Sequence, residues 1–221
     1  MNRRVAILGL VLVGIVPPEL NGFYNGFLAY FPIWFWTVEI VSWIVVPVLL
    51  LCIGSWSGWF VWSDLGFNCR IAGRRDPWLF AAVLVLLPWF VMQADFSFNS
   101  YAHALFPENR GALDFHYHDM VPKQGMGRAL ALAFMCLSAG LVEELYYRGM
   151  LRLVFAKSVA GNLGFVVVSA VIFASVHWEG GVWSLTEAFL FGVFAAIIYA
   201  FTGNLWPLII GHAWADYRWF S

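Results

Sequence analysis

Long apolar stretches alternate with shorter polar ones along this 221-residue chain. A membrane-spanning helix needs about 20 mostly apolar residues, and several of the stretches approach or exceed that length. The intervening segments are rich in glycine, proline, asparagine and charged residues, as turns are. The pattern therefore predicts an all-α bundle of about seven transmembrane helices, at residues 5–24, 31–54, 78–93, 128–157, 162–178, 184–202 and 205–219.

The composition agrees with a membrane protein. Hydrophobic residues make up 62% of the chain and charged residues 11%, whereas soluble domains contain about 25% charged residues. A formal net charge of −1 provides no basic field for nucleic acid. The scattered cysteines Cys52, Cys69 and Cys136 support neither a disulfide framework nor a thiolate metal site. We expect a multi-pass protein of a prokaryotic cytoplasmic membrane, because the chain shows no organelle signal.

Two parts of the pattern are irregular. The first helix contains Pro17 and Pro18 but lacks a small-residue cleavage site, so a retained, proline-kinked helix is predicted rather than a signal peptide. Residues 94–127 are polar and rich in asparagine, histidine and proline. They predict an extramembrane loop, with room for a short interfacial helix.

Basic residues are unevenly distributed between the predicted turns, and they predict the orientation of the bundle. With the N-terminus in the cytoplasm, eight basic residues lie on the cytoplasmic side and four on the other. The first group is Arg3, Arg4, Arg70, Arg74, Arg75, Arg148, Arg152 and Lys157, and the second is Arg110, Lys123, Arg128 and Arg218.

The helix predicted at 128–157 contains two adjacent carboxylates, in Glu143-Glu144-Leu-Tyr-Tyr-Arg148. Each charge in a membrane helix costs about 2.5–3.5 kcal/mol on insertion scales, so such residues are usually paired, face a watery cavity or take part in chemistry. Glu144 and Arg148 have the i,i+4 spacing of a favourable ion pair. Glu143 is rotated about 100° from Glu144 and has no fixed counter-ion on its helix. Glu143 is therefore the candidate for proton transfer.

Two later helices carry histidines that share a face with a neighbour at i,i+4: Phe173 with His177, and His212 with Asp216. Glu143 and His177 are each 17 residues from Ala160, within the turn between their helices. Both are thus expected about 25 Å from that turn, at equal depth.

His212 fits this geometry less well. It is only about 12 Å from the start of its helix if that helix begins near Asn204. Helix tilt, a raised turn at Gly203-Asn204 or a break at Pro207 would bring it level with His177.

These three motifs, in this order, resemble the CPBP (or ABI) family of CaaX proteases and bacteriocin-processing membrane proteins, which includes the Rce1-type prenyl-protein endopeptidases. The family pattern is Glu-Glu-x-x-x-Arg, then Phe-x-x-x-His, then His-x-x-x-Asn. The resemblance covers about residues 128–217. It implies that residues 128–221 form a catalytic helical core around an intramembrane cavity, and that residues 1–127 add helices and a loop to the same domain.

The resemblance implies a glutamic-type intramembrane protease, a hydrolase without a cofactor. Glu143 would deprotonate a water that His177 helps to position, and His212, with Asp216, would stabilise the oxyanion. Glu144, Arg148 and Phe173 would support these groups. The substrate would be a membrane-associated or lipid-linked protein or peptide, or a sorting signal, cleaved near its C-terminus. Membrane lipid would be the other partner.

Asp216 departs from the family pattern, because the prenyl endopeptidases have asparagine there. An amide can donate a hydrogen bond to an oxyanion, whereas an ionised carboxylate cannot. Either Asp216 is protonated, or it orients His212, or another group donates to the oxyanion.

Two other interpretations stay open at the level of sequence. Glu143, His177 and His212 could supply the two-histidine, one-carboxylate set of a zinc peptidase, although no His-Glu-x-x-His motif is present. Alternatively, the chain could be a non-catalytic self-immunity or scaffold protein in which these residues only form ion pairs and hydrogen bonds with one another.

Glu39 and Glu187 interrupt two other predicted helices. Both are expected to be buried hydrogen-bonding or cavity-facing residues, and Glu187 could approach the site.

Overall fold

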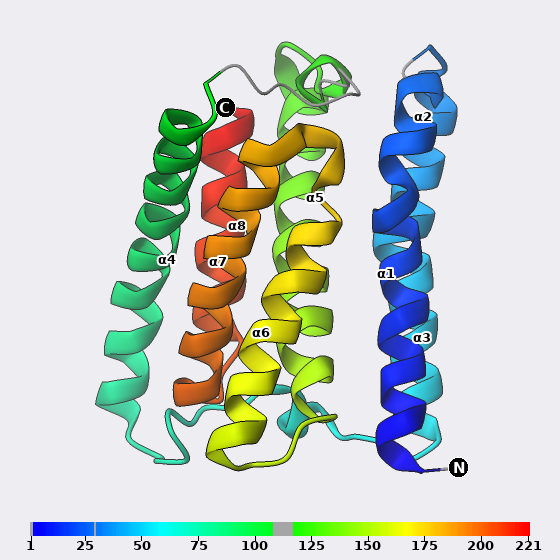
Figure 1. The fold of residues 1–221 in the computed structure, drawn as a ribbon. Helices are drawn as coiled ribbons and strands as arrows, with labels where there is room; N and C mark the ends of the chain where they lie inside the picture. The colour runs from blue at the N-terminus through cyan, green and yellow to red at the C-terminus, as the bar shows by residue number, and fades with distance from the viewer. Residues whose placement is uncertain (1, 29, 108–116) are drawn as a thin grey trace.

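The computed structural model describes residues 2–28, 30–107 and 117–221. Over these ranges the chain is helical and contains no β-strand, only an isolated bridge between Ile71 and Arg74. The helices run up and down between two ends of the molecule, and the two termini lie at opposite ends (Figure 1). The predicted all-α bundle is confirmed.

Each of the seven predicted helices corresponds to one helical segment among the described residues. The segments are α1 (Arg3–Leu28), α2–η1–α3 (Pro32–Ile40, Val41–Val45, Val46–Trp56), α4 (Pro77–Leu105), α5–η4 (Gly125–Glu143, Glu144–Met150), α6 (Val159–Ser175), α7 (Gly181–Thr202) and α8 (Trp206–Phe220). Short 3₁₀ turns occur at η2 (Trp62–Leu65), η3 (Tyr117–Met120) and η5 (Trp178–Gly180). The segments η1 and η4 are π-helical turns within continuous helices.

Four segments are long and apolar enough to cross a membrane: Pro32–Trp56, Pro77–Leu105, Gly125–Met150 and Trp178–Thr202. The helix Val159–Ser175 is apolar but shorter. Large apolar side chains such as Trp78, Val85 and Phe201 are more than 70% exposed on the outside of the bundle, as expected for surfaces in contact with lipid. The protein is an integral membrane protein.

The extramembrane loop was predicted at 94–127, but the predicted start is too early. Helix α4 continues to Leu105, and three polar residues of its last turns belong to one face. Asp95, Asn99 and His103 line an internal cavity, and their i,i+4 spacing places them on one helix face. The polarity of these three positions therefore reflects a cavity wall, whereas Ser100 is exposed. Part of the predicted loop, residues 108–116, lies outside the described residues.

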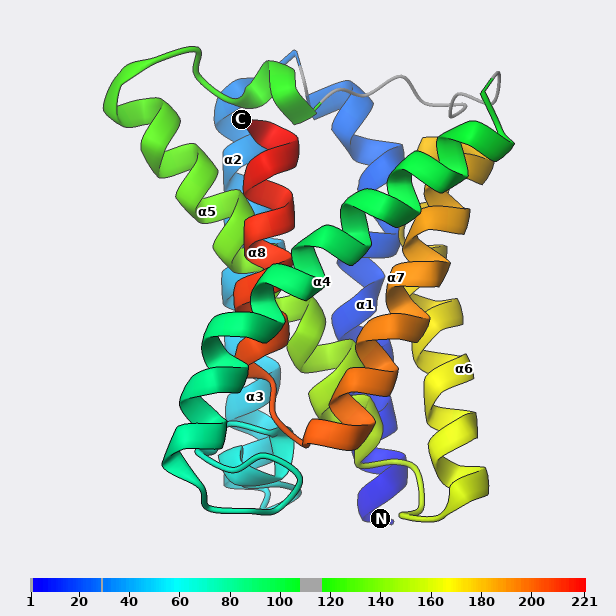
Figure 2. The same ribbon diagram turned by 90° about the vertical axis from the view of Figure 1, so that its left-hand side faces the viewer.

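Helix α4 crosses α8 diagonally and reaches α7 (Figure 2). Close contacts are possible there because small residues stand at the crossings. A Cβ added to Gly211 of α8 would be 2.8 Å from the Pro88 carbonyl oxygen of α4, and one added to Gly140 of α5 would be 2.9 Å from the Ala213 nitrogen of α8. These glycines let α8 lie against two helices at once.

Helix α1 runs through Pro17 and Pro18 without a break in the assigned helix. Its buried face, with Ile7, Val11 and Ile15, belongs to the same apolar core as the π-helical turn η4. Gly14 lies so close to the ring of Tyr146 in η4 that an added Cβ would be 2.6 Å from it. The N-terminal helices are thus packed directly against the segment that carries the acidic pair.

The charge distribution needs one correction. Arg148 is fully buried in the bundle, so it belongs to neither face. Arg3 and Arg4, the connection with Arg70, Arg74 and Arg75, and the connection with Arg152 and Lys157 remain at the N-terminal end (Figure 1). Lys123, Arg128 and Arg218 lie towards the opposite end, and Arg110 lies outside the described residues. The bias that predicts a cytoplasmic N-terminus is retained.

Candidate active site

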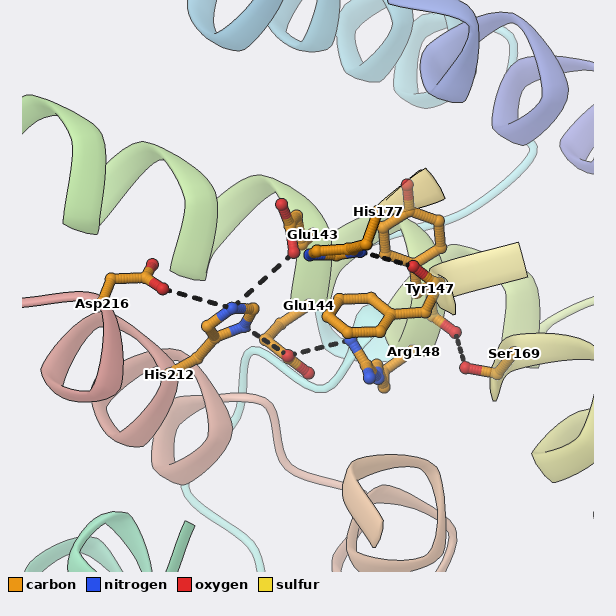
Figure 3. A network of polar contacts seen from close by, with 9 residues as sticks. Glu143, Glu144, Tyr147, Arg148, Ser169, His177, His212 and Asp216 are labelled. Carbon is orange, nitrogen blue, oxygen red and sulfur yellow. Dashed lines mark hydrogen bonds and ion pairs between the residues drawn. The ribbon is translucent and has the colours of Figure 1, made fainter. Parts of the chain in front are cut away.

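A buried ion pair lies at the centre of the site. Nη1 of Arg148 donates a hydrogen bond to Oε1 of Glu144 over 2.9 Å, and neither side chain is exposed. The i,i+4 pairing expected from the sequence is present. Nδ1 of His212 donates to the same Oε1 over 2.9 Å, so Glu144 joins η4 to α8 (Figure 3).

Glu143 is placed differently from its neighbour. Its Oε2 has no hydrogen-bond partner and lies 3.7 Å from Nε2 of His212. Its side chain is 10% exposed and lines the internal cavity. One carboxylate of the pair is therefore fixed by two donors, while the other is left available in the cavity.

The helix changes its winding between the two carboxylates. Glu143 ends α5, and the π-helical turn η4 begins at Glu144. Short π-helical segments inside α-helices are rare and occur often at functional sites. The wider turn presents Tyr146, Tyr147 and Arg148 to the core, where each is buried. The sequence does not reveal this change of winding, which depends on packing.

The position of His212 is explained by a raised turn before α8. Gly203 adopts a positive φ of 62°, and Asn204 is completely buried. The Asn204 amide donates to the carbonyl oxygens of Asn68 and Arg70. Helix α8 therefore starts inside the bundle rather than at its surface. The raised turn that the sequence allowed at Gly203-Asn204 is therefore present, and it brings His212 to the depth of the site.

The helix predicted at 162–178 includes His177. In the structure, His177 lies outside that helix. Helix α6 ends at Ser175, and His177 follows in the turn that leads to η5. Its Nδ1 donates to the carbonyl oxygen of Phe173 over 2.9 Å, which leaves Nε2 for another partner. His177 and Glu143 line the same cavity.

Aromatic rings surround the charged network. The guanidinium carbon of Arg148 lies 4.3 Å from the ring centroid of Phe173, a cation–π distance. Phe173 also contacts the rings of Tyr147, at 5.3 Å, and His212, at 6.0 Å. Phe173 therefore lies between the ion pair and the cavity, and its ring packs against both Arg148 and His212.

Asp216 lies one helical turn beyond His212. Its Oδ1 is 3.8 Å from Nε2 of His212, which is longer than a hydrogen bond. The imidazole is thus flanked by Glu144 at Nδ1 and by Glu143 and Asp216 at Nε2 (Figure 3). At this distance Asp216 is a charged neighbour of His212 without a hydrogen bond to it.

The site opens into a cavity of about 700 Å³, within the range of ligand pockets. Its lining includes Glu143, His177, His212 and Asp216 together with residues of the N-terminal helices. Towards the C-terminal end of the molecule it is lined by His103, Trp183, Arg218 and Trp219. His103 and Trp183 stack there with their centroids 4.2 Å apart.

Sequence reasoning missed Asp95 altogether, whereas Glu39 and Glu187 were expected to be buried hydrogen-bonding or cavity-facing residues. All three line the cavity. Asp95 escaped notice because it was placed in a loop. The i,i+4 series of polar residues at 95, 99 and 103 is the signal that could have revealed it.

The fold and the site together define a helical membrane protein with a paired-carboxylate and histidine centre inside the bundle. A family model supports this class: residues 125–218 match the type II CAAX prenyl endopeptidase Rce1-like family. The matched segment covers less than half of the chain, and the match is consistent with the CPBP resemblance. No curated protein and no solved structure matches the chain.

Proposed function

We propose that the protein is an intramembrane endopeptidase in which Glu143 activates the attacking water. The observation that carries this proposal is the contrast within the acidic pair. Glu144 is held by Arg148 and His212, whereas Oε2 of Glu143 has no hydrogen-bond partner and lines the cavity. A general base must be within reach of its water and free to accept a proton.

His177 and His212 divide the remaining tasks in this proposal. Because Nδ1 of His177 donates to a backbone carbonyl, its neutral Nε2 can accept a hydrogen bond from the water. The His212 ring acts with both nitrogens protonated: Nδ1–H is held by Glu144, and Nε2–H donates to the oxyanion. Asp216 keeps this ring oriented, which answers the difficulty that an ionised carboxylate cannot itself donate.

The proposed substrate is a protein or peptide whose C-terminal segment is associated with the membrane. The C-terminal ends of α4 and α8 and the start of α7 line one end of the cavity, at the molecular end opposite the N-terminus (Figure 2). With a cytoplasmic N-terminus, this end faces the extracytoplasmic side of a prokaryotic inner membrane. The geometry favours access from that side and a C-terminal sorting signal as substrate.

Access can be tested by labelling cysteines in intact cells with a membrane-impermeant maleimide. Exposed Cys69 lies in the connection at the N-terminal end and serves as the internal reference. A cysteine introduced at exposed Ser100, near the C-terminal end of α4, is expected to react while Cys69 does not. The reverse pattern would overturn the proposed orientation.

The catalytic proposal is tested with purified protein in proteoliposomes and a panel of fluorogenic peptides with apolar C-terminal segments. Wild-type protein is expected to cleave a member of the panel, and Glu143→Gln is expected to cleave none while remaining folded. Cleavage by Glu143→Gln at the wild-type rate would remove Glu143 from the mechanism. If wild-type protein cleaved no peptide and Glu143→Gln preserved a cellular phenotype, the non-catalytic interpretation would be favoured.

A further inference from the structure

The cavity has more carboxyl groups than the proposed reaction uses. Within the described part of the chain, six acidic side chains line it, one from each of six elements. Glu143 and Asp216 belong to the proposed reaction, and the other four have no place in it. The six are Glu39 of α2, Asp95 of α4, Glu143 of α5, Glu179 of η5, Glu187 of α7 and Asp216 of α8.

Fixed cations do not balance this charge. Among the described lining residues, Arg218 is the single lysine or arginine, and it lies near the end of α8. Its Nη1 donates to Sδ of Met92 over 3.1 Å and to Oε1 of Gln93 over 3.4 Å, and its guanidinium carbon lies 4.8 Å from the ring centroid of Phe96. The guanidinium is thus engaged with α4 rather than with the cavity carboxyls.

Two of the four unexplained carboxyls form a pair. The side chains of Asp95 and Glu187 lie within hydrogen-bonding reach of each other, where α4 meets α7. A hydrogen bond between two carboxyl groups requires a shared proton, and the pair then retains one negative charge. Both members also interact electrostatically with His212. The pair is therefore adjacent to the proposed catalytic group.

A third unexplained carboxyl lies on another wall of the cavity. Glu39 is 4% exposed, and its Oε1 has no hydrogen-bond partner, although its side chain is hydrogen-bonded to Trp43. A buried acceptor without a partner is costly, and this one lines a cavity large enough to admit a ligand. Glu39 is thus an independent indication that a hydrogen-bond donor enters the cavity.

We propose that the Asp95–Glu187 pair, with Glu39 on another wall of the same cavity, forms a subsite for a basic side chain of the substrate, the guanidinium of arginine or the ammonium of lysine. This inference rests on the proposed function, because it names the class of peptide that the protease would select. The carboxyls accept the charge-assisted hydrogen bonds of the cation, and the aromatic residues Trp43 and Phe96 of the lining can pack along its stem.

The arrangement suits an organic cation better than a metal ion. In the described chain, no group of three or more histidine, cysteine, aspartate or glutamate side chains is arranged to hold a metal ion. The acids are instead distributed around a cavity of about 700 Å³. A cation carried on a long, flexible side chain can reach such dispersed acceptors, whereas a metal ion needs its ligands to converge.

The test measures binding to Glu143→Gln protein in uncharged maltoside micelles, so it does not depend on cleavage. The probes are a fluorescent apolar peptide with one central arginine and the same peptide with citrulline, the neutral isostere. We expect the arginine peptide to bind about tenfold more tightly, equivalent to about 1.4 kcal/mol. This preference is expected to disappear when Asp95→Asn and Glu187→Gln are added.

Asp76→Asn is the matched control, since it removes an exposed carboxylate at the other end of the molecule and asparagine caps a helix as well as aspartate. It should keep the full preference. Equal binding of the two peptides would overturn the proposal, and so would an arginine preference that survives the double substitution. If the double variant does not fold, Asp95→Asn and Glu187→Gln are tested separately: each removes one acceptor of the pair and should weaken the preference, and a preference unchanged in both would overturn the proposal. A preference without any cleavage by wild-type protein would refute the proposed function and leave the cation subsite standing.

Discussion

The family-matched segment, residues 125–218, and the N-terminal helices before it treat charge in different ways. In the matched segment, Glu144 and Arg148 form an ion pair with no exposure of either side chain. In the N-terminal region, Arg3 and Asp64 form an ion pair at 3.0 Å, but their side chains are 55% and 40% exposed. The first pair holds a site together, and the second lies at the surface. The residues of the proposed reaction all lie in the matched segment, while the N-terminal helices complete the cavity around them.

Among the substitutions that test this comparison, Glu143→Gln is expected to have the largest effect, on the rate of peptide cleavage. The substitution keeps the size of the side chain and removes its ability to accept a proton. General base catalysis contributes about 10²–10⁴-fold to rate, so we expect a loss of that order or more in peptide cleavage, with an unchanged melting temperature. A loss of folding instead of activity would mean that Glu143 is structural like its neighbour.

The next largest effect is expected from Arg148→Ala. It leaves Glu144 buried and without its cation, and breaking one partner of a buried pair typically costs about 3–5 kcal/mol. Thermal unfolding in detergent should show a large decrease in stability. Arg148→Lys should restore it only in part, because an ammonium does not reproduce the planar guanidinium over Phe173. Full stability in Arg148→Ala would contradict the importance of the pair.

Two glycine substitutions test whether the matched segment is packed more tightly than the N-terminal helices. Gly140→Ala places a Cβ 2.9 Å from the backbone nitrogen of Ala213, and such overpacking costs about 1–3 kcal/mol. It should also reduce activity, since α8 carries His212. Gly9→Ala in α1 is the matched control, as nothing lies within 4 Å of its Cβ, and it should gain about 0.5–1 kcal/mol. Equal effects at both positions, measured by thermal unfolding, would show that the α5–α8 contact is not tight.

Asp64→Asn is expected to have a small effect. Exposed ion pairs contribute about 0–1 kcal/mol, so the melting temperature should change little and peptide cleavage should be unaffected. A decrease comparable to that of Arg148→Ala would mean that the surface pair anchors α1 against the loop containing η2.

Chelation is expected to have no effect on a glutamic mechanism. Peptide cleavage measured before and after incubation with phenanthroline should be the same, and the purified protein should contain no stoichiometric zinc. Inhibition that added zinc reverses would instead favour the two-histidine, one-carboxylate set of a zinc peptidase.

The helices and their order could be predicted because apolar runs and turn residues are local signals. Glu144 and Arg148 could be paired from spacing alone, since residues four apart meet on any α-helix. The role of Glu143 as a base stays a prediction. So do the roles of His177, His212 and Asp216, although the structure brings all four to one cavity.

Other features depended on tertiary contacts and could not be predicted in the same way. The polar turns of α4 resembled a loop because the sequence does not say whether Asp95 faces water outside the molecule or inside a cavity. His177 lies beyond the end of α6, where its ring donates to the carbonyl oxygen of Phe173. The depth of His212 depends on the burial of Asn204 against residues more than 130 positions earlier.

The π-helical turn η4 limits how the chain can vary in length. With hydrogen bonds from i to i+5, such a turn takes in more residues than an α-helical one. Deleting one residue within 144–150 would allow an ordinary α-helix to form: the flanking helix would keep its phase, but the side chains of the turn itself would point in new directions. Tyr147 and Arg148 would then leave the core. Insertions and deletions should therefore be excluded from this stretch among functional descendants of the protein, whereas the connections at the membrane surfaces can gain or lose residues freely.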